Sequence, residues 1–336
     1  MLDPAPGMPR MAAWTEEDLR SFDFALCAAG ITPQSGPAEL DLASAWLCWG
    51  TYGDDLYPAV FGAGRNMAAA RAQNRRLLAL MPVGSPAVQA PASPLEAGLA
   101  DLWARTASPL PAGLQRQFRA GVAAMLDAWL WELAGTLINR IPDPVDYLEM
   151  RRETFGSSLT MSLARIRQGL SIPQEVYQTP AIQGLEHAVS DYACLLNDVF
   201  SYQKEIEFEG EIHNGVLAVQ HFFGCGVAAA VGIVNDLMTA RMRQFERLLA
   251  TDLPALRREH RLDEEASLGL DGYVAELRDW PASILNWHTQ CRRYTEPDLR
   301  RRYRTSPRPA IGALTGLGTQ AARPRQAPPF VREKRS

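Results

Sequence analysis

The sequence has few cysteines and no uninterrupted apolar run long enough to cross a bilayer. The five cysteines are widely spaced, and none forms the CxxC pair typical of a zinc site or a disulfide framework. Their mostly apolar surroundings indicate reduced core thiols. The first residues, MLDPAPGMPRMAAW, lack the apolar segment of a secretory signal. We therefore expect no membrane partner and, by default, a cytoplasmic location.

The sequence also lacks a basic excess and several familiar enzyme motifs. The net charge of −4 provides no electrostatic footprint for nucleic acid, so we expect no nucleic-acid partner. No GxSxG, P-loop or GxGxxG motif occurs. The five histidines are dispersed, which favours structural or surface roles for each.

Helical patterns dominate, and alternating strand-like runs are scarce. Helices are expected at 15–30, 40–53, 65–80, 112–139, 145–168, 181–207, 214–223, 227–250, 263–279 and 281–294. Residues 82–95 carry four prolines and are expected to form a loop. The sequence thus predicts one all-α domain over residues 15–303. Residues 1–14 are expected to be flexible, and the Pro- and Arg-rich residues 304–336 to be disordered.

The segment NDVFSYQKE is the most informative polar pattern, because it follows an apolar helical stretch. Asn197, Ser201 and Glu205 are spaced i, i+4, i+8, which places them on nearly one face of an α-helix. A carboxamide, a hydroxyl and a carboxylate are hard oxygen donors that suit Mg²⁺, which readily shares its ligands with a phosphate. A helix end followed by a solvated charged stretch is the alternative. The complete nine-residue pattern favours the metal site.

Two adjacent acids, Asp54 and Asp55, end an expected helix that is apolar and aromatic. Carboxylates in such surroundings are costly unless something pairs with them. Metal ions are one solution, and a simple helix C-terminal turn beside Pro58 is the other.

Two arginine-containing pairs complete the set of polar features. Arg151 and Arg152 are adjacent in YLEMRRETFGSS, and arginine forks match phosphate oxygens. Surface pairing with neighbouring glutamates is the alternative. Arg293 and Tyr294 lie near the end of the last expected helix, where a solvated basic helix end is the alternative.

In this order and spacing, the four features resemble the microbial class I terpene synthase family. The family pattern is an aspartate-rich motif, a diphosphate-sensing arginine, an (N/D)Dxx(S/T)xx(K/R)(E/D) triad and a C-terminal Arg-Tyr pair. The triad pattern is matched at every specified position, including Lys204. The resemblance implies an all-α isoprenoid synthase domain with a central active-site cavity. It also implies a cyclase of the carbon–oxygen lyase type that takes a small isoprenoid substrate.

The resemblance also implies roles for individual residues. Mg²⁺, with three ions in the closed complex, is expected on Asp54, Asp55, Asn197, Ser201 and Glu205. Diphosphate contacts are expected from Arg151, Arg152, Lys204, Arg293 and Tyr294. Arg151 is the favoured sensor and joins the five metal ligands as a catalytic residue. Aromatic faces stabilise a carbocation without attacking it, and the candidates beside the motifs are Tyr52, Phe155, Phe200 and Trp287. Ordinary core packing is the alternative for each.

Three longer segments resemble the C-terminal domain of bacterial geosmin synthases: WGTYGDDLYPAVFG, NRIPDPVDYLEMRRETFGSSLTMSL and NDVFSYQKEIEFEGEIHN. That resemblance implies conversion of germacradienol to geosmin with loss of a three-carbon fragment. Direct cyclisation of farnesyl diphosphate is one alternative, and a catalytically degenerate terpenoid-binding domain is another. A prenyltransferase is disfavoured, because such enzymes carry two aspartate-rich motifs.

Two departures from the family pattern matter. The fifth position of the DDxx(D/E) motif is Pro58, so metal binding on that side is expected to be weaker or rearranged. Only 53 residues precede Asp54, so we expect an N-terminal helix to be missing and consider a second cyclase domain upstream.

Overall fold

The structure is a computed structural model that describes residues 14–84, 89–168 and 172–303. These residues form an all-α fold without strands, as the sequence predicts. The expectations for residues 1–13 and 304–336 lie outside the described residues.

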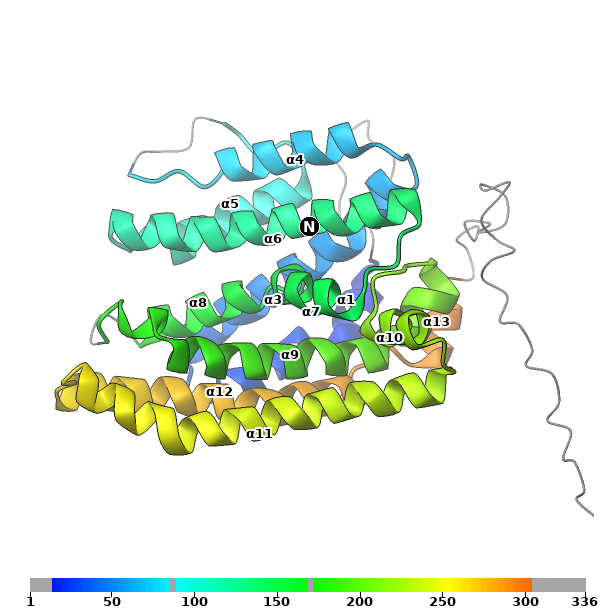
Figure 1. Cartoon of the computed structure of the whole chain (residues 1–336). Coiled ribbons are helices and arrows are strands. Elements are labelled where there is room, and N and C mark those ends of the chain that lie inside the picture. Colours follow the sequence, from blue (N-terminus) through cyan, green and yellow to red (C-terminus); the bar gives the residue numbers. More distant parts are fainter. Residues whose placement is uncertain (1–13, 85–88, 169–171, 304–336) are drawn as a thin grey trace, which may run out of the picture.

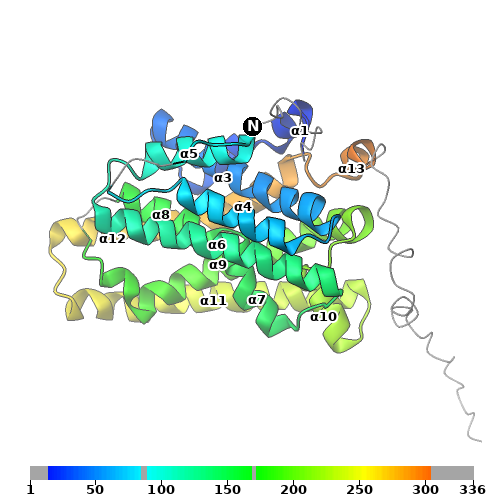
Figure 2. The same cartoon turned by 90° about the horizontal axis from the view of Figure 1, so that it is seen from above.

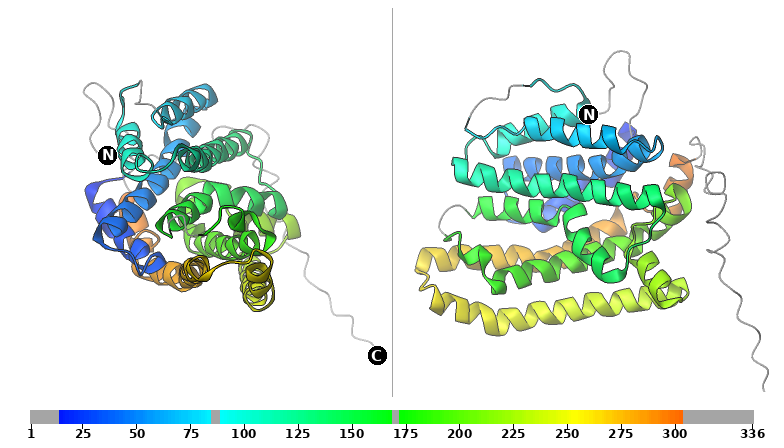
Figure 3. Two further views of the ribbon diagram at one scale, coloured as in Figure 1. Left: turned by 90° about the vertical axis from the view of Figure 1, so that its left-hand side faces the viewer. Right: turned by 45° about the horizontal axis from the view of Figure 1, so that its top comes forward.

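Five long helices run alongside one another and form the body of the fold (Figure 1). They are α3 (Pro37–Tyr57), α6 (Ala112–Ile138), α9 (Pro180–Tyr202), α11 (Val227–Glu259) and α12 (Glu264–Gln290). The shorter helices are α1 (Glu16–Phe22), α2 (Phe24–Ile31), α4 (Met67–Ala79), α5 (Pro94–Thr106), α7 (Pro144–Thr154), α8 (Ser157–Arg167), α10 (Gly215–Phe223) and α13 (Glu296–Arg302). The view from above shows the same nearly parallel arrangement (Figure 2). Along the helix axes, α3 and α12 face α8 and α9 (Figure 3, left).

Helix boundaries follow local capping signals, and they correct four sequence expectations. Asp23 has a left-handed φ of 46° and divides the expected 15–30 helix into α1 and α2. Gly156 has a left-handed φ of 75° and divides the expected 145–168 helix into α7 and α8. Pro94 occupies the first turn of α5 after the Ser93 cap, so the proline-rich loop ends in a helix that the sequence analysis missed. Pro281 lies inside α12, which joins two segments expected to be separate.

Two π-helical segments extend long helices at the same end of the fold. η1 (Pro58–Gly62) follows α3, and η3 (Gln203–Glu209) follows α9. Such wide turns occur often at functional sites. Here they continue the two helices that carry the predicted acidic motifs.

α6 has the length and apolar composition of a membrane-spanning helix. It nevertheless packs against α3, α4, α7 and α8 within the bundle. A core helix of a folded protein meets the same criteria, so this composition is weak evidence for a membrane span.

Close packing of α3 on α6 leads to a first prediction. A Cβ atom on Gly53 would lie 2.4 Å from Cη2 of Trp129, whose ring is buried. We expect Gly53→Ala to destabilise the protein by about 1–3 kcal/mol through overpacking. Gly50→Ala is the matched control on the same helix, because its Cβ meets no atom within 4 Å. Urea unfolding measures both, and equal midpoints would contradict the prediction.

Candidate active site

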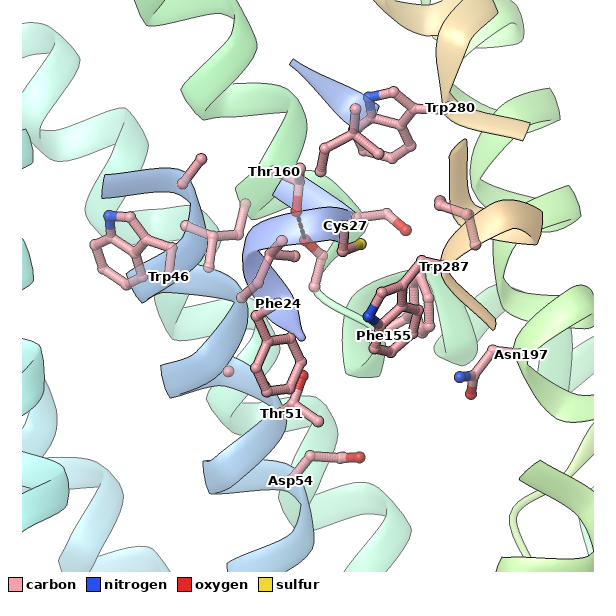
Figure 4. A pocket seen from close by; sticks show the side chains of 18 of the residues that line it. Phe24, Cys27, Trp46, Thr51, Asp54, Phe155, Thr160, Asn197, Trp280 and Trp287 are labelled. Atoms are coloured by element: carbon pink, nitrogen blue, oxygen red, sulfur yellow. Dashed lines mark hydrogen bonds between the residues drawn. The ribbon is translucent and has the colours of Figure 1, made fainter. Parts of the chain in front are cut away.

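A cavity with an aromatic interior and a polar end lies between α2, α3, α7, α8, α9 and α12. Its apolar wall includes the aromatic side chains Phe24, Trp46, Phe155, Trp280 and Trp287. Its polar lining includes Asp54, Arg151, Asn197, Lys204, Glu205, Arg293 and Tyr294. Figure 4 shows Asp54 and Asn197 at one end of the cavity and Trp46 and Trp280 toward the other. Residues separated by up to 270 positions, Phe24 and Tyr294, thus line one cavity.

Arg151, from α7, is fixed by two consecutive residues of α9. Its Nη2 donates to Asn197 Oδ1 at 2.8 Å, and its Nε donates to Asp198 Oδ1 at 3.2 Å. Asp198 is fully buried and also accepts from Tyr147 Oη at 2.8 Å and from the Gly215 amide at 3.0 Å. Asp198 therefore positions the arginine and does not belong to a solvated stretch.

Arg152, which the sequence analysis also expected to contact diphosphate, does not line the cavity. Its Nε and Nη2 donate to the buried carboxylate of Asp191 at 2.5 and 3.0 Å. Arg241 of α11 pairs with the same carboxylate at 2.7 Å. Neighbouring residues of a helix point about 100° apart, which separates the two arginines. Arg152 ties α7 to α9, and α11 joins through the same carboxylate.

The two adjacent aspartates of α3 have different surroundings. Asp55 accepts from Arg293 Nη2 at 2.8 Å, Lys204 Nζ at 3.3 Å and Trp14 Nε1 at 2.6 Å. Burial opposes its charge, but Arg293 and Lys204 outweigh burial and lower the pKa of Asp55. Burial raises the pKa of Asp54 to about 7, against the influence of Arg151. Asp54 lines the cavity, whereas the Asp55 carboxylate pairs with the side chains of Arg293 and Lys204.

The π-helical η3 changes the predicted geometry of the Asn/Ser/Glu triad. On an α-helix a four-residue step overshoots one turn by about 40°. In the wider π turn, the four-residue step from Ser201 to Glu205 covers less than one full turn. The overshoot from Asn197 to Ser201 and the shortfall from Ser201 to Glu205 therefore have opposite signs. Glu205 Oε2 accepts from Asn214 Nδ2 at 2.9 Å, and burial raises its pKa. Ser201 is 1% exposed, and its hydroxyl has no hydrogen-bond partner within the described chain.

Two of the four candidate cavity aromatics do not line the cavity. Phe155 and Trp287 do, whereas Tyr52 and Phe200 do not. Tyr52 packs edge-on against Trp14 with a centroid separation of 5.2 Å. Phe200 packs against the ring of His288 at 5.1 Å. Core packing, the alternative interpretation, therefore describes Tyr52 and Phe200.

His288, which no sequence motif singles out, is 3% exposed and lines the cavity. Burial lowers the pKa of His288 to about 4, so its imidazole is neutral at pH 7. A helical-spacing signal existed, because Trp280, Ile284 and His288 follow at four-residue intervals on α12 and all line the cavity.

The sequence analysis missed Glu132 of α6. It lies one turn beyond Trp129, which packs against Gly53 next to Asp54. Burial and the neighbouring Asp54 raise the pKa of Glu132, while Arg151 and a hydrogen bond from Thr154 act in the opposite direction. A second helix thus places a carboxylate beside Asp54.

The residues at the polar end suit a hard divalent cation. Within the described ranges, no three His, Cys, Asp or Glu side chains gather as a metal-binding group. The candidate donors are instead mixed oxygens: the Asp54 and Glu205 carboxylates and the Asn197 amide line the cavity. The Ser201 hydroxyl does not line it, but it is buried one helical turn after Asn197 and has no hydrogen-bond partner among the described residues. Such a set fits Mg²⁺, which keeps waters and shares ligands with phosphate.

An all-α bundle that joins an aromatic cavity to oxygen donors, arginines and a lysine is what the resemblance to class I terpene synthases predicts. The chain belongs to this class through terpene synthase family 2, whose C-terminal metal-binding region matches residues 45–244. It is therefore a terpene cyclase of the carbon–oxygen lyase type, and it uses a divalent metal.

Individual relatives agree with this assignment. Pristinol synthase of Streptomyces pristinaespiralis is 26% identical over 306 residues, which cover 88% of this chain and 79% of the relative. The (2E,6E)-farnesyl diphosphate-cyclising (+)-T-muurolol synthase of Roseiflexus castenholzii is 27% identical over 82% of this chain and 81% of the relative. The structure of linalool/nerolidol synthase from Streptomyces clavuligerus with 2-fluorogeranyl diphosphate has the same fold. Its TM-score is 0.70 at 24% identity, covering 82% of this chain and 92% of that one.

Proposed function

We propose that this protein is a sesquiterpene cyclase that ionises farnesyl diphosphate directly. The observation that carries the proposal is the cationic end of the aromatic cavity. Arg293 is 3% exposed, and its Nη1 has no hydrogen-bond partner in the part of the chain that the structure describes. A buried guanidinium N–H without an acceptor suits an anion such as diphosphate.

Four side chains would hold the diphosphate of the substrate. Arg151, Lys204, Arg293 and Tyr294 all line the polar end and can donate hydrogen bonds. Tyr294 Oη already accepts from Arg293 Nε at 3.3 Å, so its own proton remains available. Breaking the allylic carbon–oxygen bond sends the electron pair to the diphosphate, whose growing negative charge these donors stabilise.

Mg²⁺ would be held by Asp54, Asn197, Ser201 and Glu205. When bound, the metal neutralises charge on the leaving group. We assign no metal role to Asp55, because its oxygens are engaged by Arg293, Lys204 and Trp14. The count of three ions stays an expectation from the family.

The aromatic wall would then hold the carbocation. Phe155 and Trp287 are joined there by Phe24, Trp46 and Trp280. Each aromatic face contributes roughly 0.5–2 kcal/mol, depending on desolvation. The indole nitrogen of Trp287 donates to the Phe22 carbonyl at 2.7 Å, which fixes the ring without offering a nucleophile.

Conversion of germacradienol to geosmin is the second candidate and rests on the three segments that resemble geosmin synthases. Germacradienol carries no diphosphate, so it would leave the cationic end of the cavity without a ligand. This difference favours farnesyl diphosphate.

Incubation with Mg²⁺ and either farnesyl diphosphate or germacradienol, followed by gas chromatography and a pyrophosphate assay, separates these functions. We expect a cyclic product and released pyrophosphate from farnesyl diphosphate alone. Turnover of germacradienol alone would overturn the proposal. Turnover of neither would favour a degenerate terpenoid-binding domain.

We also propose that Glu132 supplements the acidic side where Pro58 stands in place of an acid. Glu132→Gln is expected to raise the Mg²⁺ concentration for half-maximal turnover by about 10-fold, as loss of metal-supporting groups does. Asp127→Asn is the matched control, because Asp127 lies on the exposed face of α6. Mg²⁺ titrations of turnover measure both. An equal shift in the two variants would reject a local role for Glu132.

A further inference from the structure

His288 lies between a backbone carbonyl and the amide of Asn197. Its Nδ1 is 2.7 Å from the Ile284 carbonyl oxygen, and its Nε2 is 3.0 Å from Asn197 Nδ2. A carbonyl can only accept, so Nδ1 carries a proton. Asn197 Oδ1 accepts from Arg151, so the N–H donor Nδ2 faces Nε2, and Nε2 therefore accepts through its lone pair.

Asn197 has all its amide groups engaged by this arrangement. Its two N–H groups donate to His288 Nε2 and to Tyr294 Oη, the latter at 2.9 Å. Its Oδ1 accepts from Arg151 Nη2 at 2.8 Å. Rotating the amide by 180° would set oxygen against the lone pair of His288 and N–H against the donor of Arg151. Only the observed orientation satisfies every group.

The imidazole ring of His288 is itself held in place. It stacks on the ring of Tyr294 with a centroid separation of 5.3 Å and an interplanar angle of 15°. The rings of Phe200 and Trp287 pack against the same imidazole, with centroid separations of 5.1 and 4.6 Å. The acceptor at Nε2 is therefore rigidly placed before any ligand binds.

We propose that His288 is a positioning residue that orients the Asn197 amide so that its oxygen faces Arg151 and the metal-binding side. This inference rests on the proposed function, because it concerns how one predicted metal ligand is presented. It gives His288 a role other than proton transfer, since the lone pair on Nε2 accepts from Asn197 and the Nδ1 proton is donated to the Ile284 carbonyl.

Binding of Mg²⁺ and inorganic pyrophosphate, measured by isothermal titration calorimetry, tests the proposal without turnover. His288→Phe keeps a stacking ring and removes the acceptor, so we expect affinity to fall by about 10- to 100-fold. His288→Gln places a carbonyl oxygen near the position of Nε2 and should restore most of the affinity. Thr289→Ala is the matched control, because Thr289 is exposed and its hydroxyl donates to the Asn286 carbonyl.

The Asn197→Asp background separates orientation from cavity shape. A carboxylate presents oxygen in either orientation, and phenylalanine has no lone pair to repel it. We therefore expect His288→Phe to weaken binding by less than about threefold in that background, against the 10- to 100-fold loss beside Asn197. An equal loss in both backgrounds, or none beside Asn197, would overturn the proposal.

Folding and the proposed function are checked separately. Circular dichroism establishes that each variant is folded. If His288→Phe does not fold, His288→Gln decides, and its failure to bind overturns the proposal. Wild-type protein that binds no Mg²⁺ with pyrophosphate would instead reject the proposed function.

Discussion

Replacing Arg151 with glutamine is expected to reduce turnover of farnesyl diphosphate by about 10²–10³-fold, the loss seen when one donor to a developing anion is removed. Arg151 is the only one of the two adjacent arginines that lines the cavity. Its guanidinium also holds Asn197 Oδ1, so the substitution disturbs a predicted metal ligand as well. Both effects act on the leaving diphosphate.

The same substitution is expected to destabilise the fold. Arg151 is 6% exposed and its partner Asp198 is fully buried. Removing one member of a buried ion pair costs about 3–5 kcal/mol, because the other charge is left uncompensated. Total stabilities are about 5–15 kcal/mol, so the loss should be evident in urea unfolding.

Arg152→Gln is the matched control on the neighbouring residue. Asp191 keeps Arg241 as a partner after this change, and Arg152 does not line the cavity. Arg152→Gln should therefore lower stability less and leave kcat of the folded fraction nearly unchanged. A similar fall in kcat for both variants would show that the assignment of Arg151 as sensor is wrong.

Local periodicity is what the sequence offered for predicting the triad. The i, i+4, i+8 spacing of Asn197, Ser201 and Glu205 predicts a shared face of an α-helix, and this prediction needs no tertiary information. The same rule could not foresee the π turn at Gln203–Glu209, because the rule assumes α-helical hydrogen bonding throughout.

Pairings between distant residues were beyond the reach of the sequence. Asp55 and Arg293 are 238 positions apart, and Asn197 and His288 are 91 apart. Neither pair has a local signature. The resemblance to the family's aspartate-rich motif implied that Asp55 is a metal ligand. Only the fold shows that Arg293 and Lys204 lie close enough to pair with its carboxylate.

Changing Asn197, Ser201 and Glu205 together to alanine is expected to eliminate Mg²⁺-dependent turnover, with a loss of more than about 10³-fold. The three residues supply three of the four oxygen donors assigned to the metal. Their single effects should not add, because they act on one ion-binding unit. Assays with farnesyl diphosphate, germacradienol and Mg²⁺ measure the loss. A triple variant as active as the wild type on either substrate would refute the metal assignment.

Substitution of Glu205 should show how much folding stability the site loses by burying a carboxylate without a bound metal. Burial raises its pKa, against Lys204 and Arg151, so the folded protein disfavours its charged form. A carboxyl with a raised folded-state pKa reduces stability above its unfolded-state pKa, and therefore at pH 7. Glu205→Gln is thus expected to raise Tm in EDTA but to lose the stabilisation that Mg²⁺ with pyrophosphate gives the wild type. Thermal unfolding under both conditions measures this reversal. A Glu205→Gln variant that is less stable in EDTA and still stabilised by Mg²⁺ would assign Glu205 to the fold and not to the metal.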